Sequence, residues 1–451
     1  MVLTACSEAA VGVVRDDAAA DPPGTVIDAG TADALVISTA DDASAGPGDD
    51  AAATPVVHPD AAALDAAAAR PDATAGRADA AAPDANVPPP VGDVHAGGAY
   101  HPDEDCTQYP FSATALLAEL EGFGRNTTGG DPARPYIVTS LGESGPGTLR
   151  AGLESNQPYW IGFDVEGDIV LDDDGRIEVT SNKTVDGRGR NITIKGSIRI
   201  RDAVNVIFTD LKMENDLEGH CTQSGDVLPI GGDRGPTGAD YHTRNIWINH
   251  MEIYNGGDGL IDLRGATDVT VSWAHMHTHK KGLLWSDPDD GLTGGGQHVT
   301  LHHSFFDRIS LRGPQFIGGW LHFYNNYQFQ WYEYGAGGLR EAQFYSENNV
   351  YEARPGSFCF IRSMCADPNP CGDFDTRVSK LGLVSDWSGN GIGYTKSVGD
   401  LALEGAILDQ NEPARVTFDP ASRYTYTAEP ADMVLTDRLR RGTGPRVDYC
   451  R

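Results

Sequence analysis

Three aspartates stand in positions that could hold a cation. Asp258 and Asp262 are four residues apart in Gly257-Asp-Gly-Leu-Ile-Asp262, and Asp226 lies upstream in Ser224-Gly-Asp-Val-Leu228. Side chains alternate between the two faces of an extended segment, so the even spacing puts Asp258 and Asp262 on one face. Carboxylates that converge from neighbouring segments form the oxygen site that Ca²⁺ prefers. Spacing alone also allows the simpler interpretation that these are Gly-Asp turns.

Two basic residues follow the aspartates along the chain. Lys281 lies in His279-Lys-Lys-Gly282, and Arg312 lies in Leu311-Arg-Gly-Pro314. Cations beside an acidic cluster suit an anionic substrate, because they bind its carboxylates while calcium bridges the protein to a sugar acid. The alternative is that each is a surface charge.

A run of histidines raises the question of a transition-metal site. It consists of His275, His277, His279, His302 and His303, and alternation puts the first three on one face. The sequence shows no carboxylate partner and no close ligand spacing, so we expect histidines satisfied within the fold.

Short strands must position these residues. From about residue 180 the chain alternates apolar and polar residues in short runs, which is the signature of β-strands. Most run starts are 21 to 40 residues apart, within the range of about 20–45 residues typical of solenoid repeats. The runs are 191–194, 205–208, 245–248, 268–271, 298–301, 321–324 and 342–345.

These repeats predict an all-β fold, a parallel β-helix. Asparagines mark its turns, because Asn tolerates a left-handed backbone and can stack between coils. These are Asn205, Asn245, Asn325, Asn326, Asn348 and Asn349. A β-sandwich is the alternative, but its turns recur about every 8–12 residues. Residues 112–121 have helical spacing and are predicted to cap the open end of the solenoid.

Composition divides the 451 residues into unequal parts. Residues 1–6 resemble the end of a lipoprotein signal peptide, and 7–98 form an Ala/Asp/Pro-rich segment that we expect to be a disordered linker. Residues 99–451 are expected to form the solenoid domain. With 34 basic and 65 acidic residues the net charge is −31, which argues against nucleic acid as a partner. No apolar run is long enough to span a membrane.

Cysteine usage favours export. Leu3-Thr-Ala-Cys6 resembles a lipobox, so we expect a lipid anchor at Cys6 and a secreted or outer-surface protein. The six other cysteines are an even number and favour disulfides in an oxidising compartment. Cys359, Cys365 and Cys371 leave a zinc site open, although their spacing is not that of a zinc ribbon.

The chain resembles the pectate lyase family, polysaccharide lyase family one, over roughly residues 117–355. No single motif is decisive, but their order and spacing together are highly specific. The main segments are 121–124, 128–130, 144–150, 184–189, Asn245-Ile-Trp-Ile-Asn-His250, 258–262, 271–273, 299–303, Arg312-Gly-Pro314 and His322-Phe-Tyr-Asn-Asn326.

The resemblance implies a right-handed parallel β-helix that cleaves homogalacturonan (pectate) by β-elimination, usually with Ca²⁺. It places the calcium ligands at Asp226, Asp258 and Asp262, and a substrate-binding, catalytic Lys at Lys281, with Lys280 as the fallback. It makes Arg312 the substrate-contacting catalytic base, a role carried over from the family because a guanidinium normally stays protonated. We expect a monomer whose partner is an acidic polysaccharide.

Two positions depart from the family pattern. Asn249 stands where the family commonly has Asp, and Ile317 stands where a second Arg often meets a substrate carboxylate. Two rivals follow: a non-catalytic, surface-anchored polysaccharide-binding β-helix, and a glycoside hydrolase on the same fold. Hydrolysis needs an acid/base carboxylate pair, and the polygalacturonase signature is not found here.

Overall fold

The computed structural model describes residues 111–172, 176–215, 225–232, 241–277, 279–286, 296–354, 380–385 and 391–449. The predicted lipobox, linker and domain boundary at residue 99, together with all seven cysteines, lie outside these ranges. The lipid anchor and the disulfides therefore stay predictions. Within the ranges described, no helix is long and apolar enough to cross a membrane.

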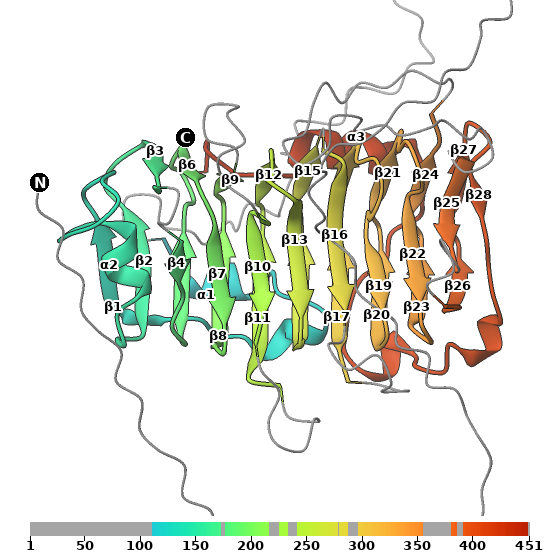
Figure 1. Cartoon of the computed structure of the whole chain (residues 1–451), viewed down its shortest axis with the longest axis horizontal. Helices are drawn as coiled ribbons and strands as arrows, with labels where there is room; N and C mark the ends of the chain where they lie inside the picture. Colours follow the sequence, from blue (N-terminus) through green and yellow to red (C-terminus); the bar gives the residue numbers. More distant parts are fainter. Residues whose placement is uncertain are drawn as a thin grey trace, which may run out of the picture. The chain divides into compact units, whose positions relative to one another are not determined.

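The described chain winds into three parallel sheets, here called sheets I, II and III (Figure 1). Sheet I contains β1 (Asp131–Val138), β2 (Tyr159–Phe163), β5 (Lys183–Asp186), β8 (Val204–Thr209), β11 (Thr243–Asn249), β14 (Ala266–Ser272), β17 (His298–His302), β20 (Trp320–Tyr324), β23 (Gln343–Glu347) and β26 (Tyr394–Val398). Sheet II contains β3 (Gly167–Val170), β6 (Ile192–Lys195), β9 (Lys212–Glu214), β12 (Glu252–Tyr254), β15 (His275–His277), β18 (Phe305–Asp307), β21 (Tyr327–Phe329), β24 (Val350–Glu352) and β27 (Leu401–Leu403). Sheet III contains β4 (Ile177–Glu178), β7 (Ile198–Arg201), β10 (Leu228–Gly231), β13 (Gly259–Arg264), β16 (Lys281–Ser286), β19 (Gln315–Ile317), β22 (Ala336–Leu339), β25 (Leu381–Val384) and β28 (Ile407–Leu408).

From β2 onward, each turn of the chain adds one strand to sheet I, then II, then III, which confirms the predicted parallel β-helix. Six of the seven predicted strands lie in sheet I, and only 191–194 falls in sheet II, as β6. Many sheet II strands are three residues long, too short to show an alternating pattern.

Two-residue corners join sheet I to sheet II along most of the solenoid. The first corner residue has φ between 46° and 61° at Asp210, His250, Trp273, His303, Asn325 and Asn348. Asn205 and Asn245 also have positive φ, at 67° and 56°. Asn adopts this left-handed conformation at lower cost than most residues. The predicted asparagine-marked turns are confirmed at Asn325 and Asn348, whereas Asn205 and Asn245 lie within β8 and β11.

A buried asparagine ladder follows the last of these corners. The Asn326 side chain accepts from Ser304 N–H at 2.9 Å and donates to the Leu301 carbonyl at 2.9 Å. One coil further on, Asn349 accepts from Asn326 N–H at 2.8 Å and donates to the Phe323 carbonyl at 2.8 Å. The ladder thereby satisfies backbone groups that the corners leave unpaired.

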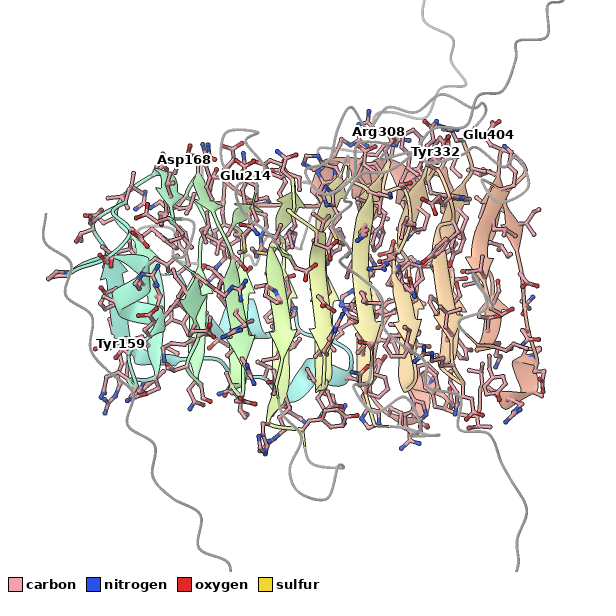
Figure 2. The ribbon with its side chains drawn as sticks, viewed as in Figure 1. Tyr159, Asp168, Glu214, Arg308, Tyr332 and Glu404 are labelled. Carbon is pink, nitrogen blue, oxygen red and sulfur yellow. The ribbon has the colours of Figure 1, made fainter. Side chains whose placement is uncertain are left out.

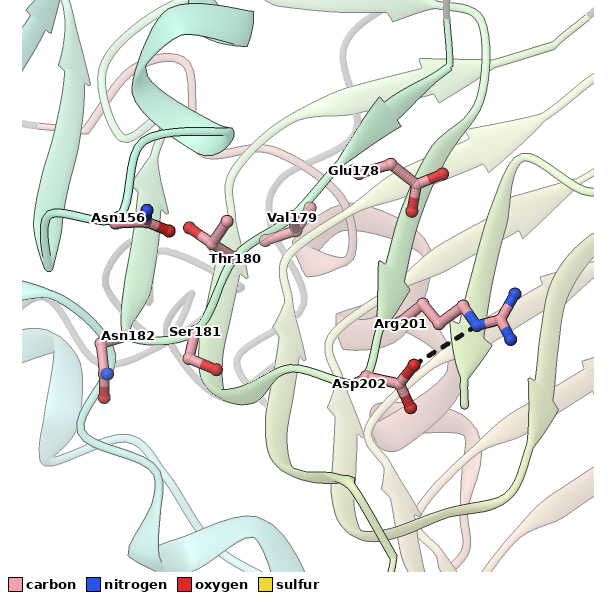
Figure 3. Close-up of a pocket in the computed structure, with 8 residues that line it drawn as sticks. All are labelled: Asn156, Glu178, Val179, Thr180, Ser181, Asn182, Arg201 and Asp202. Atoms are coloured by element: carbon pink, nitrogen blue, oxygen red, sulfur yellow. Dashed lines mark ion pairs between the residues drawn. The ribbon is translucent and has the colours of Figure 1, made fainter. Parts of the chain in front are cut away.

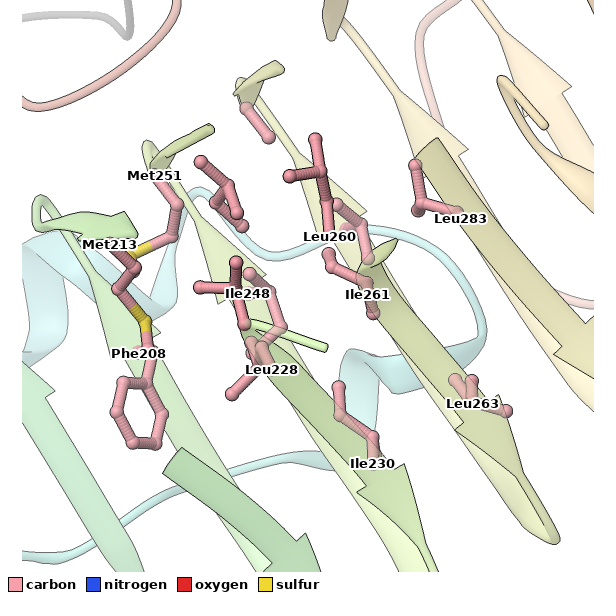
Figure 4. Packing of buried hydrophobic residues seen from close by; sticks show 14 of the residues in the cluster. Phe208, Met213, Leu228, Ile230, Ile248, Met251, Leu260, Ile261, Leu263 and Leu283 are labelled. Carbon is pink, nitrogen blue, oxygen red and sulfur yellow. The ribbon is translucent and has the colours of Figure 1, made fainter. Parts of the chain in front are cut away.

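The interior of the solenoid is apolar (Figure 4). Ile248 from sheet I, Ile253 from sheet II and Leu263 from sheet III are fully buried. Because parallel strands stack in register, apolar side chains at equivalent positions of successive coils pack on one another. This packing fixes the spacing of the strands that carry the site.

The predicted cap is wrong in its position. The helix α1 (Ala113–Leu117) is shorter than predicted, and Leu116 packs against Trp160 and Trp247 on the outer face of sheet I. Instead, α2 (Leu149–Leu153) places Leu149 and Leu153 in the main core, beside the first strands. Outward tryptophans on sheet I give α1 an apolar surface to cover, which local spacing could not reveal.

The C-terminal region adds a coil, β25 to β28, and then returns along the solenoid. Two 3-10 turns, η4 (Pro413–Arg415) and η5 (Pro420–Ser422), flank Phe418, which packs with η1 (Phe123–Asn126) and Tyr424 over sheet I. The helix α3 (Met433–Gly442) packs Leu435 and Leu439 on the outer face of sheet II.

Candidate functional site

The three predicted aspartates come from neighbouring coils of sheet III. Asp226 precedes β10, Asp258 precedes β13, and Asp262 lies within β13. The Gly259 N–H donates to Asp226 Oδ1 at 3.0 Å, which joins the two coils at this point. A Cβ on Gly259 would lie 2.6 Å from that oxygen, so a larger residue here would displace the Asp226 carboxylate.

The electrostatics show that the aspartates influence one another. Burial, reinforced by the charges of Asp262 and Asp258, raises the pKa of Asp226 to about 6. Burial also raises the pKa of Asp262, although Arg264 and Arg312 oppose this effect. Keeping buried, neighbouring carboxylates ionised costs free energy, and a cation bound between them would offset that cost.

The two predicted cations lie on the next coils of sheet III. Lys281 pairs with Gly259 in the register of β13 and β16, and its Nζ donates to Asp258 Oδ1. Arg312 lies one coil further along, where its carbonyl accepts from Leu283 N–H at 2.6 Å. The fold therefore arranges the aspartates, the lysine and the arginine in order along sheet III.

Arg312 is held in an unusual conformation. Its φ is 61°, and its Nε is buried without a hydrogen-bond partner. Lys280 lies instead beside Glu333, whose charge opposes the lowering of the Lys280 pKa by burial. Lys281 is thus hydrogen-bonded to the aspartate cluster, whereas the carboxylate whose charge acts on Lys280 is Glu333.

The three carboxylates are the type of ligand that calcium prefers, although they do not yet converge on a single position. The carboxylate oxygens of Asp226, Asp258 and Asp262 do not all lie within 4.8 Å of one another. Asp262 Oδ1 is buried and has no hydrogen-bond partner, so it is an oxygen in need of a ligand. Oxygen-only donors, mutual repulsion and this unpaired oxygen are the features that a bound Ca²⁺ would satisfy.

Two charged residues near the site were not predicted from the sequence. Arg264 Nε lies 3.1 Å from Asp262 Oδ2, with the Arg264 side chain 64% exposed, and its spacing of two residues along the strand was an available signal. Glu333 belongs to the loop between β21 and β22, and its charge acts on Arg312. No local pattern marks Glu333, because only the winding of the chain brings it there.

The departures from the family pattern have different settings. Asn249 is buried in sheet I, where its Oδ1 accepts from Ser272 Oγ at 2.8 Å and its Nδ2 donates to Thr209 Oγ1 at 3.3 Å. Its amide is therefore satisfied on a sheet that does not carry the aspartates. Ile317 lies in β19 of sheet III, the strand that follows Arg312, so its substitution concerns the candidate site directly.

The histidine run is divided among several environments. His275 and His277 share one face of β15, but His279 does not join them, because its Nε2 lies 3.1 Å from the carbonyl of Asp258. His302 and His303 contact each other through Nδ1 atoms 2.9 Å apart in the buried corner. The expectation that the first three histidines share a face is wrong for His279, because the chain turns toward sheet III there.

A polar depression lies elsewhere on sheet III (Figure 3). It is lined by Asn156, Glu178, Val179, Thr180, Ser181, Asn182, Arg201 and Asp202. Within it Arg201 Nε and Asp202 Oδ2 lie 3.4 Å apart. The lining comes from the segment before β2, from the end of β4 and the residues that follow it, and from the end of β7. It includes none of the three aspartates, so the depression is separate from the aspartate cluster.

Comparisons with known proteins identify the family. Residues 172–397 match the family model described as pectate lyase. The chain is 34% identical over 245 residues to a pectate lyase of Nicotiana tabacum, covering 51% of this chain and 61% of the relative. It is 31% identical over 329 residues to putative pectate lyase 21 of Arabidopsis thaliana, covering 70% of this chain and 77% of the relative. The chain thus spans about three fifths of the length of the tobacco relative and of a tomato relative that matches equally well.

Solved structures agree on the fold. The crystal structure of jun a 1, the major allergen from cedar pollen, superposes with a TM-score of 0.58 at 22% identity, covering 78% of this chain and 99% of that one. A pectate lyase from Bacillus sp. N165 in complex with trigalacturonate gives a TM-score of 0.51 at 21% identity, covering 73% and 99%. The predicted right-handed parallel β-helix is thereby confirmed. Together with the sequence matches, these findings show that the chain belongs to the pectate lyase family.

Proposed function

We propose that this protein is a polysaccharide lyase that cleaves homogalacturonan by Ca²⁺-dependent β-elimination and releases 4,5-unsaturated oligogalacturonates. The observation that carries the proposal is the row on sheet III: Asp226, Asp258 and Asp262, then Lys281, then Arg312. Family membership supports it, as does the trigalacturonate held by the Bacillus sp. N165 pectate lyase.

In the proposed reaction the substrate is a uronate whose C5 proton lies α to the carboxylate. Asp226, Asp258 and Asp262 would hold Ca²⁺, which when bound withdraws charge from that carboxylate and so acidifies the C5 proton. Lys281 contributes a second positive charge on the same side and stabilises the enolate-like transition state. Its hydrogen bond to Asp258 keeps it oriented before substrate binds.

Arg312 is the proposed base. The matching arginine of the family supports this role, and the bridge between Lys281 and Leu311 places Arg312 one coil beyond the lysine on the same sheet. In its neutral guanidine form Arg312 takes the proton from C5, the C4–O bond breaks, and the electron pair forms the C4–C5 double bond. The departing glycosyl oxygen takes a proton from water, so the reaction is balanced without a redox partner.

Location follows from the same substrate. Homogalacturonan is an extracellular polymer, and we infer that the protein is exported and is either secreted or held at the outer surface by a lipid on Cys6. Disulfides among the six remaining cysteines and a monomeric state complete the proposal. These features rest on the sequence alone.

A second candidate is a surface-anchored β-helix that binds the polysaccharide without cleaving it. Ile317 favours this candidate, because an apolar residue stands where an arginine would meet a substrate carboxylate. The retained Lys281 and Arg312 argue against it.

The test uses the full chain, stripped of metal by a chelator and incubated with polygalacturonate with and without Ca²⁺. Ultraviolet absorbance of the unsaturated uronide is followed. We expect an increase that requires Ca²⁺ and is lost in Asp262→Asn but kept in Asp164→Asn, which alters an exposed acid outside the site. Binding of polygalacturonate without an increase in absorbance would refute the lyase and favour the binding protein. An increase in the absence of Ca²⁺ would refute the proposed requirement for the metal.

A further inference from the structure

A second cluster of metal-ligating side chains lies on sheet II, apart from the aspartates. It consists of Glu252 on β12 with His275 and His277 on β15. One ligand atom from each residue can be chosen so that all three lie within 4.8 Å of one another. Figure 2 labels Glu214 and Arg308, which lie on the coils to either side of this cluster.

The strand register creates the cluster. Glu252 lies opposite His275 in the parallel pairing of β12 and β15, so the two side chains stand side by side about 4.8 Å apart on one face. His277 lies two residues further along and points to the same face. Its Nε2 is 3.1 Å from Glu252 Oε1. The carboxylate thus comes from the preceding coil, 23 residues before His275, where no ligand-spacing pattern reveals it.

Neighbouring rings hold both imidazoles in place. The Tyr254 ring stacks on His277 with centroids 4.8 Å apart, and the Phe305 ring stacks on His275 with centroids 5.1 Å apart. The site remains accessible, since the side chains of Glu252, His275 and His277 are 25%, 26% and 22% exposed. The ligands are therefore oriented before a metal arrives, and solvent reaches part of each side chain, although His275 Nε2 itself is buried.

The charged residues around the cluster are compatible with a bound cation. Nε2 of His275 is buried without a hydrogen-bond partner, and it lies 3.9 Å from Asp307 Oδ2. Asp307 is neutralised in turn by two hydrogen bonds from Arg308, at 2.7 and 2.8 Å. Lys212 Nζ lies 3.8 Å from Glu252 Oε2 and competes with a metal for that carboxylate.

We propose that Glu252, His275 and His277 form a site for a divalent transition metal, with Zn²⁺ as the best match. Two imidazoles and one carboxylate are an established donor set for zinc, which takes a water as its fourth ligand. Bonds of about 2.0–2.2 Å in a tetrahedron place ligand atoms roughly 3.3 Å apart, so small side-chain rotations close the present arrangement. The metal would join β12 to β15 and brace two coils of the solenoid.

The test titrates Zn²⁺ into the metal-stripped full chain by calorimetry, with thiols blocked so that cysteines do not bind the ion. We expect one equivalent to bind, and the affinity to fall about tenfold or more in His277→Gln and in Glu252→Gln. His242→Gln is the matched control, because that exposed histidine lies 3.7 Å from Asp202 and belongs to no three-ligand cluster within the described part of the chain. Zn²⁺ should raise the melting temperature of the wild type and of His242→Gln, but not of the site variants.

Acidification provides a separate readout. Ligand imidazoles must be neutral, so Zn²⁺ affinity should fall as the pH is lowered. Equal affinity in the wild type and both site variants, or no binding by the wild type, would overturn the site. Melting in chelator shows whether each variant is folded. If His277→Gln is not folded, Glu252→Gln, which keeps size and shape, decides the outcome.

Discussion

The substitution Asp226→Asn tests two effects of the aspartate cluster: its cost to the stability of the native protein and its contribution to Ca²⁺ binding. Burial and the neighbouring aspartates raise the pKa of Asp226 from 3.8 to about 6. Because a tenfold change in proton affinity is worth about 1.4 kcal/mol, keeping this carboxylate ionised at neutral pH costs the native protein about 3 kcal/mol. Asn removes the charge but keeps an oxygen that can accept from Gly259 N–H.

The variant should therefore be more stable than the wild type when no calcium is present. A gain of up to about 3 kcal/mol over the roughly 280 described residues corresponds to a rise of about 5 °C in melting temperature. The sign of the pH dependence follows from the raised pKa. Between pH 3.8 and about 6 the native state binds more protons than the unfolded chain, so wild-type stability falls as the pH rises through this window.

The assay is thermal and urea unfolding at pH values on either side of this window, in chelator and in excess Ca²⁺. Calcium should stabilise the wild type and have much less effect on Asp226→Asn, because a ligand is lost. Asp164→Asn, which removes an exposed charge, should behave as the wild type. The reasoning fails if Asp226→Asn is less stable than the wild type in chelator at neutral pH, or if calcium stabilises both equally.

Three further results are expected. Arg312→Lys should lower turnover by at least about a thousandfold while polygalacturonate binding survives, and an active variant in the absorbance assay would remove Arg312 as the base. Asn326→Ala should cost about 2–4 kcal/mol in urea unfolding, since it leaves two backbone groups unpaired, and a loss below about 1 kcal/mol would show that water replaces the ladder. Asp210→Asn should cost about 2–3 kcal/mol, because the buried Arg446 guanidinium loses charge-assisted hydrogen bonds to one of its two carboxylate partners and keeps Glu119. Burial raises the Asp210 pKa, but Arg446 outweighs it and lowers the value to about 2, so this contribution is present above pH 3.8 and is lost as the pH falls through 2. Acid unfolding that is equally steep in Asp210→Asn would contradict this assignment.

Local sequence was enough to predict one sheet and the character of the turns. The strands of sheet I are four to eight residues long, and several have an asparagine near one end, such as Asn245 in β11 and Asn325 after β20. Alternation and turn residues therefore both appear in the sequence. Asn325 and Asn348 occupy left-handed corners for the reason that made them predictable, the low cost of positive φ for Asn. The short strands of sheet II carry no comparable pattern.

The candidate site was partly predictable for a similar reason. The resemblance supplied Asp226, Lys281 and Arg312 as expectations, and the fold places them along one sheet. Arg264 was within reach of the same reasoning, two residues from Asp262 on one strand. Glu333 was not, because its approach to Arg312 depends on the loop of another coil.

The kind of fold and the chemical types of the acting residues could be read from the chain alone, since repeat length, alternation and turn residues are local properties. Which residues became neighbours was settled by three-dimensional packing. Stacking in register brings Glu252 beside His275, and Gly259 leaves space for the Asp226 carboxylate of the preceding coil. Contacts between coils join residues more than 20 positions apart, and their geometry is set by how the apolar interior packs the strands, which no short window of sequence contains.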